Sequence, residues 1–435
     1  MIQIAALLCP DWYLPGMPQQ TPAPQRPLEF RYWERIDEPW VRRLRAVLRR
    51  TTGFDPAPPE EVVRTFASMY YDADPLAEAF VDEVYLGRSP DEGRALLDQA
   101  ITSGVDSIED PPASLVELFA DIEEDPDWVD HRLVDLGARV FRRYGTSVFR
   151  FAGTITLAAY AENSVAKPLI LSGAYTGAST RNRFAETAAF WIDVSEPGGM
   201  SPGEPGRAAA LRVRIMHVFV RRRLLAHPEW DLEAWGVPIS QADALLTLMG
   251  GSAAPGLAMQ AMGYRPTGEE IRAMMHFWRY IGHIMGVRPR WYPKDLREAI
   301  QLAFMTQLKG ARGAGEDGRR LCQAYVTAFA PQPDPTGSLL GRLTAAWENG
   351  VHLGYARFFL PGPMYRDFGL PSVGLFALHP LVQAPFRFAA ETLRRNVPAL
   401  DDIADRRARA SRRRWVDRQL GTKAAAFDAP RKFTR

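Results

Sequence analysis

The chain has 435 residues, of which 53 are Lys or Arg, 51 are Asp or Glu, 46% are hydrophobic and only two are cysteines. These proportions are typical of a folded globular protein, and they exclude a chain that is disordered throughout, a collagen-like chain and a disulfide framework. The length allows two or three domains, or one large helical domain with extensions.

The first 30 residues are rich in Pro and Gln and predict an irregular lead-in. They contain a short apolar run without a preceding basic region, which makes a poor signal peptide, so the expected location is cytoplasmic. From residue 31 onward, apolar residues recur at three- and four-residue steps, as in amphipathic helices. This pattern is clear in the following ranges: 40–48, 75–86, 114–121, 128–144, 155–171, 181–194, 208–225, 240–249, 269–285, 294–308 and 319–330.

Capping residues support several of these helices. Asp127 and Ser240 stand where an N-cap is expected, and Gly173, Gly236 and Gly286 follow apolar helical stretches, where glycine accepts a left-handed conformation. Alternating strand patterns are scarce. The sequence therefore predicts an all-α protein, with one large helical domain over 31–400 and a tail over 401–435.

The helix predicted over 181–194 carries Arg183 and Thr187, which are four residues apart and share one face. An arginine and a hydroxyl on an otherwise apolar wall can hold a polar oxidant. A salt bridge and a surface threonine are the commoner arrangement, so both interpretations stay open. A Pro- and Gly-rich connector, 195–207, follows this helix and cannot be part of a helix or strand.

The next helix carries His217 beside Val213 and Met216 on its apolar face, so its imidazole is expected to point inward. A lone inward histidine is usually a packed core residue, although it can also be a metal or haem ligand. Arg214 and Arg221 flank it, and guanidinium groups suit paired carboxylates such as haem propionates. A solvated basic face or salt bridges explain these arginines equally well.

Other motifs have simpler interpretations. His276 and His283 share a helical face in an aromatic segment, which favours core packing. Residues 313–318 match the glycine spacing of a dinucleotide site, but a helical stretch precedes them where such a site needs a strand, which favours a helix–helix loop. The spacings typical of NTPases, serine hydrolases and zinc proteases are missing.

Two features of the C-terminal part concern membranes and polyanions. The longest charge-free stretch, 368–386, is nearly long enough to span a bilayer, but three prolines interrupt it, so we expect irregular apolar chain packed on the domain. No integral membrane span is expected. Residues 406–435 contain 11 basic and two acidic residues, against 42 and 49 in the rest of the chain. We interpret this segment as a solvated helical tail and assign it no nucleic-acid function.

The motifs occur in a distinctive order. They are Arg183-x-x-x-Thr187, the connector, Arg212-Val213-Arg214-Ile215-Met216-His217-x-x-x-Arg221, Trp235-Gly236-Val237-Pro238-Ile239-Ser240-Gln241-x-Asp243 and Phe277-Trp278-Arg279-Tyr280-Ile281-Gly282-x-x-x-Gly286-Val287. Over about residues 130–330, this order resembles the latex-clearing-protein family of rubber oxygenases and their relatives, which include the fungal mycophenolic-acid oxygenase.

The resemblance implies a haem b, and hence an iron centre, in a globin-like helical core with additional N- and C-terminal helices. His217 matches the family's proximal ligand, and Arg183 and Thr187 match its distal catalytic residues. One departure is Glu186, which stands where the latex enzymes have lysine before the threonine. Glu162 is the nearest match to the family's distal acid.

The leading hypothesis is a haem-dependent oxygenase or dioxygenase that uses O2 to oxidise or cleave an unsaturated, isoprenoid-like lipid. In that reading, Arg183 and Thr187 are catalytic, His217 binds the metal, and Arg214 and Arg221 help to bind the cofactor. The alternatives are a haem or apolar-ligand binding protein without turnover, such as a sensor or carrier, and a helical scaffold without a cofactor.

Overall fold

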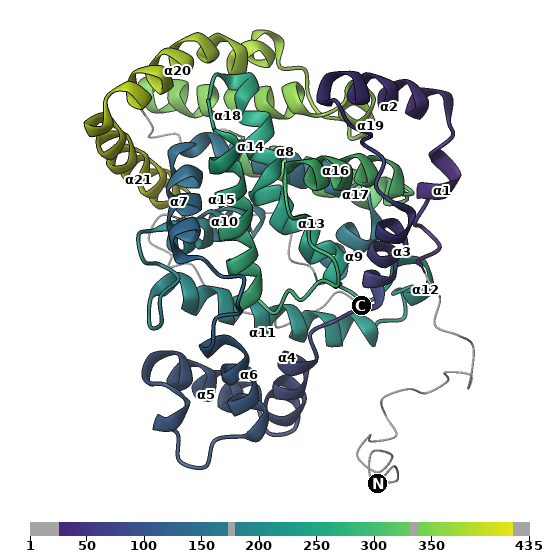
Figure 1. Ribbon diagram of the computed structural model, residues 1–435, viewed down its shortest axis with the longest axis vertical. Coiled ribbons are helices and arrows are strands. Elements are labelled where there is room, and N and C mark those ends of the chain that lie inside the picture. Colours follow the sequence, from purple (N-terminus) through teal and green to yellow (C-terminus); the bar gives the residue numbers. More distant parts are fainter. Residues whose placement is uncertain (1–25, 173–178, 331–337, 421–435) are drawn as a thin grey trace.

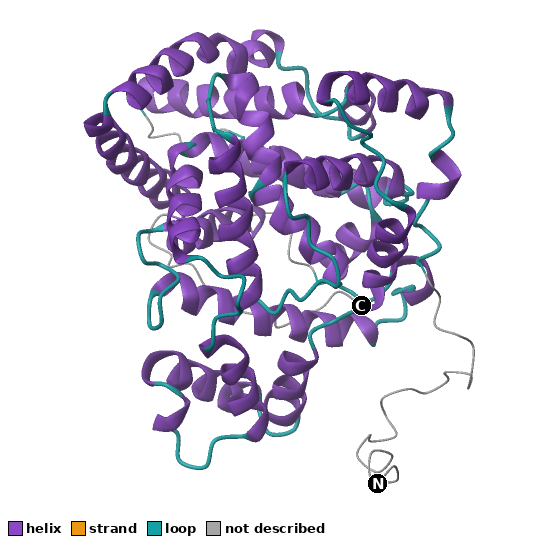
Figure 2. Cartoon of the chain, in the orientation of Figure 1, coloured by secondary structure: helices purple, strands orange, loops and turns teal. Residues whose placement is uncertain are grey.

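The computed structural model describes residues 26–172, 179–330 and 338–420, and every regular element in them is helical (Figure 2). The all-α fold class is therefore confirmed. None of the described helices is both long enough and apolar enough to cross a membrane. The α-helices are α1 (Tyr32–Arg35), α2 (Pro39–Thr52), α3 (Glu60–Ser68), α4 (Pro75–Phe80), α5 (Pro90–Ser103), α6 (Ala113–Glu123), α7 (His131–Arg143), α8 (Thr146–Ala159), α9 (Asn163–Leu171), α10 (Ser179–Ser195), α11 (Pro205–Leu225), α12 (Leu232–Trp235), α13 (Gln241–Gly251), α14 (Ala253–Ala258), α15 (Gly268–Ile284), α16 (Leu296–Lys309), α17 (Gly315–Phe329), α18 (Leu339–Phe359), α19 (Gly362–Asp367), α20 (His379–Asn396) and α21 (Pro398–Leu420). Short helices of other types are η2 (Met69–Tyr71), η3 (Val81–Leu86), η4 (Val105–Ser107), η5 (Met259–Met262) and η6 (Gly374–Leu378).

Local sequence signals explain many of these boundaries. Ser240 caps α13 as predicted, because its hydroxyl accepts a hydrogen bond from the backbone N–H of Asp243. The cap of α7 is Asp130 and not Asp127, since the Asp130 carboxylate accepts from the first turn of that helix. The helix predicted over 155–171 is two helices, α8 and α9, which are separated at residues 160–162. Gly173 lies outside the described residues.

α7 and α15 form the most extensive helix pair, and they pack closely along their length in the left half of the view (Figure 1). Their close approach depends on Gly137, because a Cβ atom there would lie 2.1 Å from the backbone oxygen of Ala273. α11 crosses below this pair in Figure 1 and contacts α15, α10 and α4. The helices before α7 form the lower lobe and right edge of the view, and α18, α20 and α21 form its upper left edge.

The C-terminal part differs from the sequence-based expectation in two ways. The apolar stretch 368–386 is not packed on the domain: most of its residues after 370 are exposed or half-buried, and it forms η6 and the start of α20. Pro380 lies in the first turn of this helix, where a backbone donor is not needed, whereas Pro385 lies inside the helix. Residues 398–420 are not a solvated tail. They form α21, which packs on α10 and α7 and buries Trp415 and Val416.

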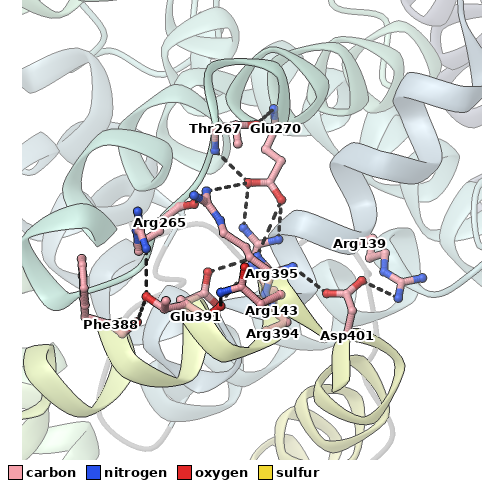
Figure 3. Close-up of polar contacts among 12 residues, drawn as sticks. Arg139, Arg143, Arg265, Thr267, Glu270, Phe388, Glu391, Arg394, Arg395 and Asp401 are labelled. Atoms are coloured by element: carbon pink, nitrogen blue, oxygen red, sulfur yellow. Dashed lines mark hydrogen bonds and ion pairs between the residues drawn. The ribbon is translucent and has the colours of Figure 1, made fainter. Parts of the chain in front are cut away.

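An ion-pair network fixes these last two helices to the core (Figure 3). Glu270 of α15 binds Arg143 of α7 at 2.7 Å, and the same arginine lies 3.5 Å from Glu391 of α20. Arg394 of α20 then binds Asp401 of α21 at 2.7 Å. Because these charges are largely buried and joined in one network, α20 and α21 are held in fixed positions on the domain.

Candidate functional site

The connector between α10 and α11 brings the two candidate helices together. Gly198 and Gly203 have φ values of +70° and +80°, a left-handed conformation that glycine adopts without strain. At the start of α11, a Cβ atom on Gly206 would lie 2.6 Å from the backbone oxygen of Asp193 on α10. The turn-rich sequence therefore permits a close contact between the end of one helix and the start of the next.

His217 lies in the middle of α11 and is half-buried, although its neighbours Val218 and Phe219 are buried. Within the described part of the chain, no side chain or backbone group forms a hydrogen bond or ion pair with its imidazole. Burial among apolar groups, together with the nearby Arg221 charge, lowers the pKa of His217 to about 4, against a smaller opposing effect of Asp74. The ring is therefore neutral at pH 7, and a neutral imidazole nitrogen is a good metal ligand.

Arg214, one turn before His217, is bound by carboxylates. Its Nε and Nη2 atoms lie 2.7 and 2.9 Å from the two carboxylate oxygens of Asp74, and its Nη1 lies 3.2 Å from Asp121. The side chain is 1% exposed. Burial alone would lower the pKa of Arg214, but the hydrogen bonds and negative charges of Asp74 and Asp121 together outweigh it and raise the pKa above its usual value. The backbone of Gly286 packs directly against this ion pair, since a Cβ atom there would lie 2.0 Å from Asp74 Oδ2.

Arg221, one turn after His217, is also bound by protein groups through all three of its guanidinium nitrogens. Its guanidinium donates to the backbone oxygens of Pro238 at 2.9 Å and Ile239 at 2.7 Å, and it binds Glu78 at 3.1 Å. Both flanking arginines thus fix α11 to α4 and to the segment before α13. The structure brings them close to His217 in sequence and space, but it leaves their donors bound to protein groups.

Arg183 and Thr187 lie one turn apart on α10, as the sequence spacing predicts. Arg183 is half-buried, and its Nη1 lies 3.5 Å from a carboxylate oxygen of Glu186. Thr187 is exposed, and its hydroxyl donates to the backbone oxygen of Arg183 at 3.1 Å. Because that proton is donated within the helix, the remaining lone pairs of Thr187 are free to accept a hydrogen bond from a ligand.

Glu162, the nearest match to the family's distal acid, lies outside α10 and α11. It lies at the start of α9 and lines a cavity of about 20 Å³ with Tyr70 and Lys309. A second cavity, of about 170 Å³, lies between the end of α6, α7 and the connector, and neither cavity is lined by His217, Arg183 or Thr187.

Of the two histidines expected to pack in the core, His283 is buried and His276 is half-buried. His276 accepts a hydrogen bond from the backbone N–H of Asp130 at 2.9 Å, and His283 is buried beside Tyr280 and Trp128. No group of three His, Cys, Asp or Glu residues in the described ranges is arranged to hold a metal ion. The sequence reasoning missed Asp74, the main partner of Arg214. Its position before Pro75 marks it as an N-cap, which was the available signal.

Comparisons with known proteins give three findings. Residues 139–395 match the profile of a family described as ER-bound oxygenase mpaB/B'/Rubber oxygenase, catalytic domain. The chain is 26% identical over 232 residues to the rubber oxygenase of Streptomyces sp. (strain K30). The aligned region covers 51% of this chain and 54% of that protein, so the chain spans about half the length of this relative. Its fold is similar to the structure of latex clearing protein LCP in the closed state, with a TM-score of 0.56, 20% identity, and coverage of 80% of this chain and 91% of that one.

Proposed function

The chain belongs to the family of ER-bound oxygenases mpaB/B' and rubber oxygenases, and from this premise we propose that it is a haem b-dependent oxygenase or dioxygenase. Its substrate would be an unsaturated, isoprenoid-like lipid, and O2 would be the oxidant. The observation that carries the proposal is the state of His217. Its imidazole is neutral at pH 7, has no protein partner among the described residues and is partly exposed to solvent in the middle of a largely buried helix.

The ligand chemistry of His217 fits a porphyrin held by one imidazole, although neither cavity described above is lined by it. A single histidine is sufficient for a cofactor that brings four ring nitrogens of its own, whereas a metal ion without a cofactor needs several protein ligands. His217 would hold the iron, and the bound haem would supply the oxygen chemistry. Arg214 and Arg221 would act through α11, because their bonds to Asp74, Glu78 and backbone oxygens hold the helix, and so His217, in place. Direct contact of these two arginines with the cofactor stays a prediction.

Residues of α10 would form the opposite wall. The Arg183 guanidinium would place a positive charge beside the substrate and the oxidant, and Thr187, whose proton is donated within the helix, would accept a hydrogen bond there. The half-buried side chains Phe184 and Met216 would give an apolar substrate a dry surface. Glu186 would position Arg183 through their ion pair.

The same ion pair supports a second candidate function. A carboxylate beside Arg183 partly neutralises the charge that turnover would use, so a haem or apolar-ligand binding protein without turnover, such as a sensor or carrier, is the alternative. A Glu186→Gln variant distinguishes the two, because it frees Arg183: a catalytic site would retain or gain activity, whereas a carrier would stay inactive.

The test is oxygen uptake by the haem-loaded protein with squalene, an unsaturated isoprenoid, and with its saturated counterpart squalane as the control. The proposal predicts uptake with squalene only. Arg183→Ala should lose most of this uptake while keeping the haem spectrum. Spectral changes on adding squalene without uptake would favour the carrier, and a protein that binds neither haem nor squalene would contradict both functions.

A further inference from the structure

Three C-terminal elements that contact one another present exposed apolar side chains to solvent, and we call this set of side chains the apolar face. Eight large side chains form it, each at least half exposed, and they are Leu339, Leu340, Leu343, Trp347, Leu375, Leu378, Val382 and Phe386. They come from the first half of α18, from η6 and from the start of α20, which lie together at the top of the molecule (Figure 1). Such a concentration of exposed apolar area in one place marks an interaction surface.

The α20 part of this face follows helical spacing. Val382, Phe386, Ala389 and Leu393 stand at i, i+4, i+7 and i+11, so they form one stripe along the helix, and all four are exposed. Phe386 is 76% exposed. α20 is therefore amphipathic, with its apolar side directed away from the protein.

The parts contributed by α18 and η6 are fixed against each other. A Cβ atom on Gly354 of α18 would lie 2.2 Å from the backbone oxygen of Phe376, and one on Gly350 would lie 2.6 Å from its ring. The exposed Trp347 ring packs at 5.3 Å from Phe376 and 5.8 Å from His379. These contacts join α18, η6 and α20 into one surface.

The side of α20 that faces the protein forms buried ion pairs, and these prevent the helix from rotating its apolar side into the protein. Glu391 is 6% exposed and binds Arg143 and Arg394, which belong to the network of Figure 3. Rotating α20 to bury Phe386 would expose or break this network, and separating buried ion pairs is costly.

Basic residues flank the apolar face. On α21, which packs beside α20, four arginines are exposed, and no acidic side chain within the described ranges pairs with them: Arg406, Arg407, Arg414 and Arg418. Arg342 is exposed within the α18 part of the face itself. Among the acids of these helices, Glu348, Glu391, Asp401, Asp402 and Asp405 are each paired with an arginine, and Asp417 is exposed between Arg414 and Arg418 in the sequence. The face and its border therefore combine apolar area with positive charge.

We propose that the apolar face docks on the surface of an anionic lipid bilayer, with the apolar side chains in the interface and the arginines against lipid headgroups. An amphipathic helix with a basic flank binds membranes in this way without crossing them. A second copy of the chain fits less well, because a two-fold contact would bring the positively charged borders of both copies together. The proposal does not depend on the proposed function.

Co-sedimentation of the full-length protein, without substrate, with phosphatidylcholine vesicles and with vesicles containing 30% phosphatidylglycerol tests it. We expect binding to the anionic vesicles and much weaker binding to the neutral ones. Val382→Ser with Phe386→Ser should weaken binding at least about tenfold. Arg406→Glu with Arg407→Glu should abolish the preference for anionic vesicles.

Leu86→Ser with Val116→Ser is the matched control, because it removes two exposed apolar side chains at the other end of the molecule, and it should bind like the unmodified protein. All variants should unfold at unchanged temperature, since the substituted side chains are exposed. No binding to either kind of vesicle, or equal loss in the control, would overturn the proposal. A concentration-dependent dimer in analytical ultracentrifugation that disappears in the Val382→Ser, Phe386→Ser variant would also overturn it, in favour of an interface between copies.

Discussion

The polar residues of α11 differ sharply in how they are satisfied. Arg214 and Arg221 donate to carboxylates and backbone oxygens, and within the described residues His217 between them has no such partner. Removing one partner of a buried charge strongly destabilises a fold, whereas substituting an imidazole that has no protein hydrogen bond breaks no such interaction. The same helix therefore contains a structural part, built on Asp74, and a part that remains available to a ligand.

The largest expected effect is on the structural part. Asp74→Ala leaves the Arg214 guanidinium buried without its main partner, so we expect the free energy of unfolding to fall by about 3–5 kcal/mol in urea denaturation. The control is Asp98→Ala, which breaks the exposed pair with Arg212 and should cost less than about 1 kcal/mol. Equal effects of the two substitutions would mean that burial of Arg214 has no energetic consequence.

Gly286→Ala should have the next largest effect. At φ +73°, the new Cβ atom would lie 2.0 Å from Asp74 Oδ2 and 2.5 Å from Arg214 Nε, so strain and collision add to a cost of about 3 kcal/mol. Gly53→Ala is the matched control, because its φ is +80° but no atom lies within 4 Å. It should cost about 1–2 kcal/mol from strain alone. If both variants unfold at the same temperature, the collision with the Asp74–Arg214 pair is not important.

The pH dependence of the free energy of unfolding should reveal the effect of His283, a buried histidine that we interpret as structural. Burial and the nearby Arg288 lower the pKa of His283 to about 4, although Asp121 opposes them. Between about pH 6.5 and 4, the unfolded chain binds a proton at this residue and the folded chain does not. The free energy of unfolding therefore falls by up to about 1.4 kcal/mol for each unit by which the pH is lowered. Above pH 6.5 this contribution is fully present.

His283→Gln should therefore reduce the loss of stability in that pH range, measured by urea denaturation at several pH values. His131→Gln, which removes an exposed imidazole, should leave the loss unchanged. A steep loss that is identical in all three proteins would assign the pH dependence to other groups.

The smallest effect is expected at the ligand side of α11. His217→Ala in the protein without haem should change the free energy of unfolding by no more than about 1 kcal/mol, because no protein hydrogen bond is lost. His276→Ala, which removes the acceptor for the Asp130 N–H, should cost about 1–2 kcal/mol. A large cost for His217→Ala would show that its ring has a structural role.

Sequence reasoning found the helices that carry the motifs, the caps with local signals and the family resemblance, which the comparisons confirm. It placed Arg183, Thr187 and His217 on their helices because helical spacing is local. It could not tell that Arg214 and Arg221 are saturated, because their partners Asp74 and Glu78 lie about 140 residues away in the chain. It also misjudged 368–386, since apolar composition alone does not show whether a helix faces the protein or the solvent.

The central claim, that His217 is free to hold a haem, is tested most directly by the absorption spectrum of the purified protein after haem is added. The account predicts a Soret band of bound haem for the unmodified protein and for His283→Ala, and its loss or a large shift in His217→Ala. Identical spectra for all three proteins, or no bound haem in any of them, would contradict it.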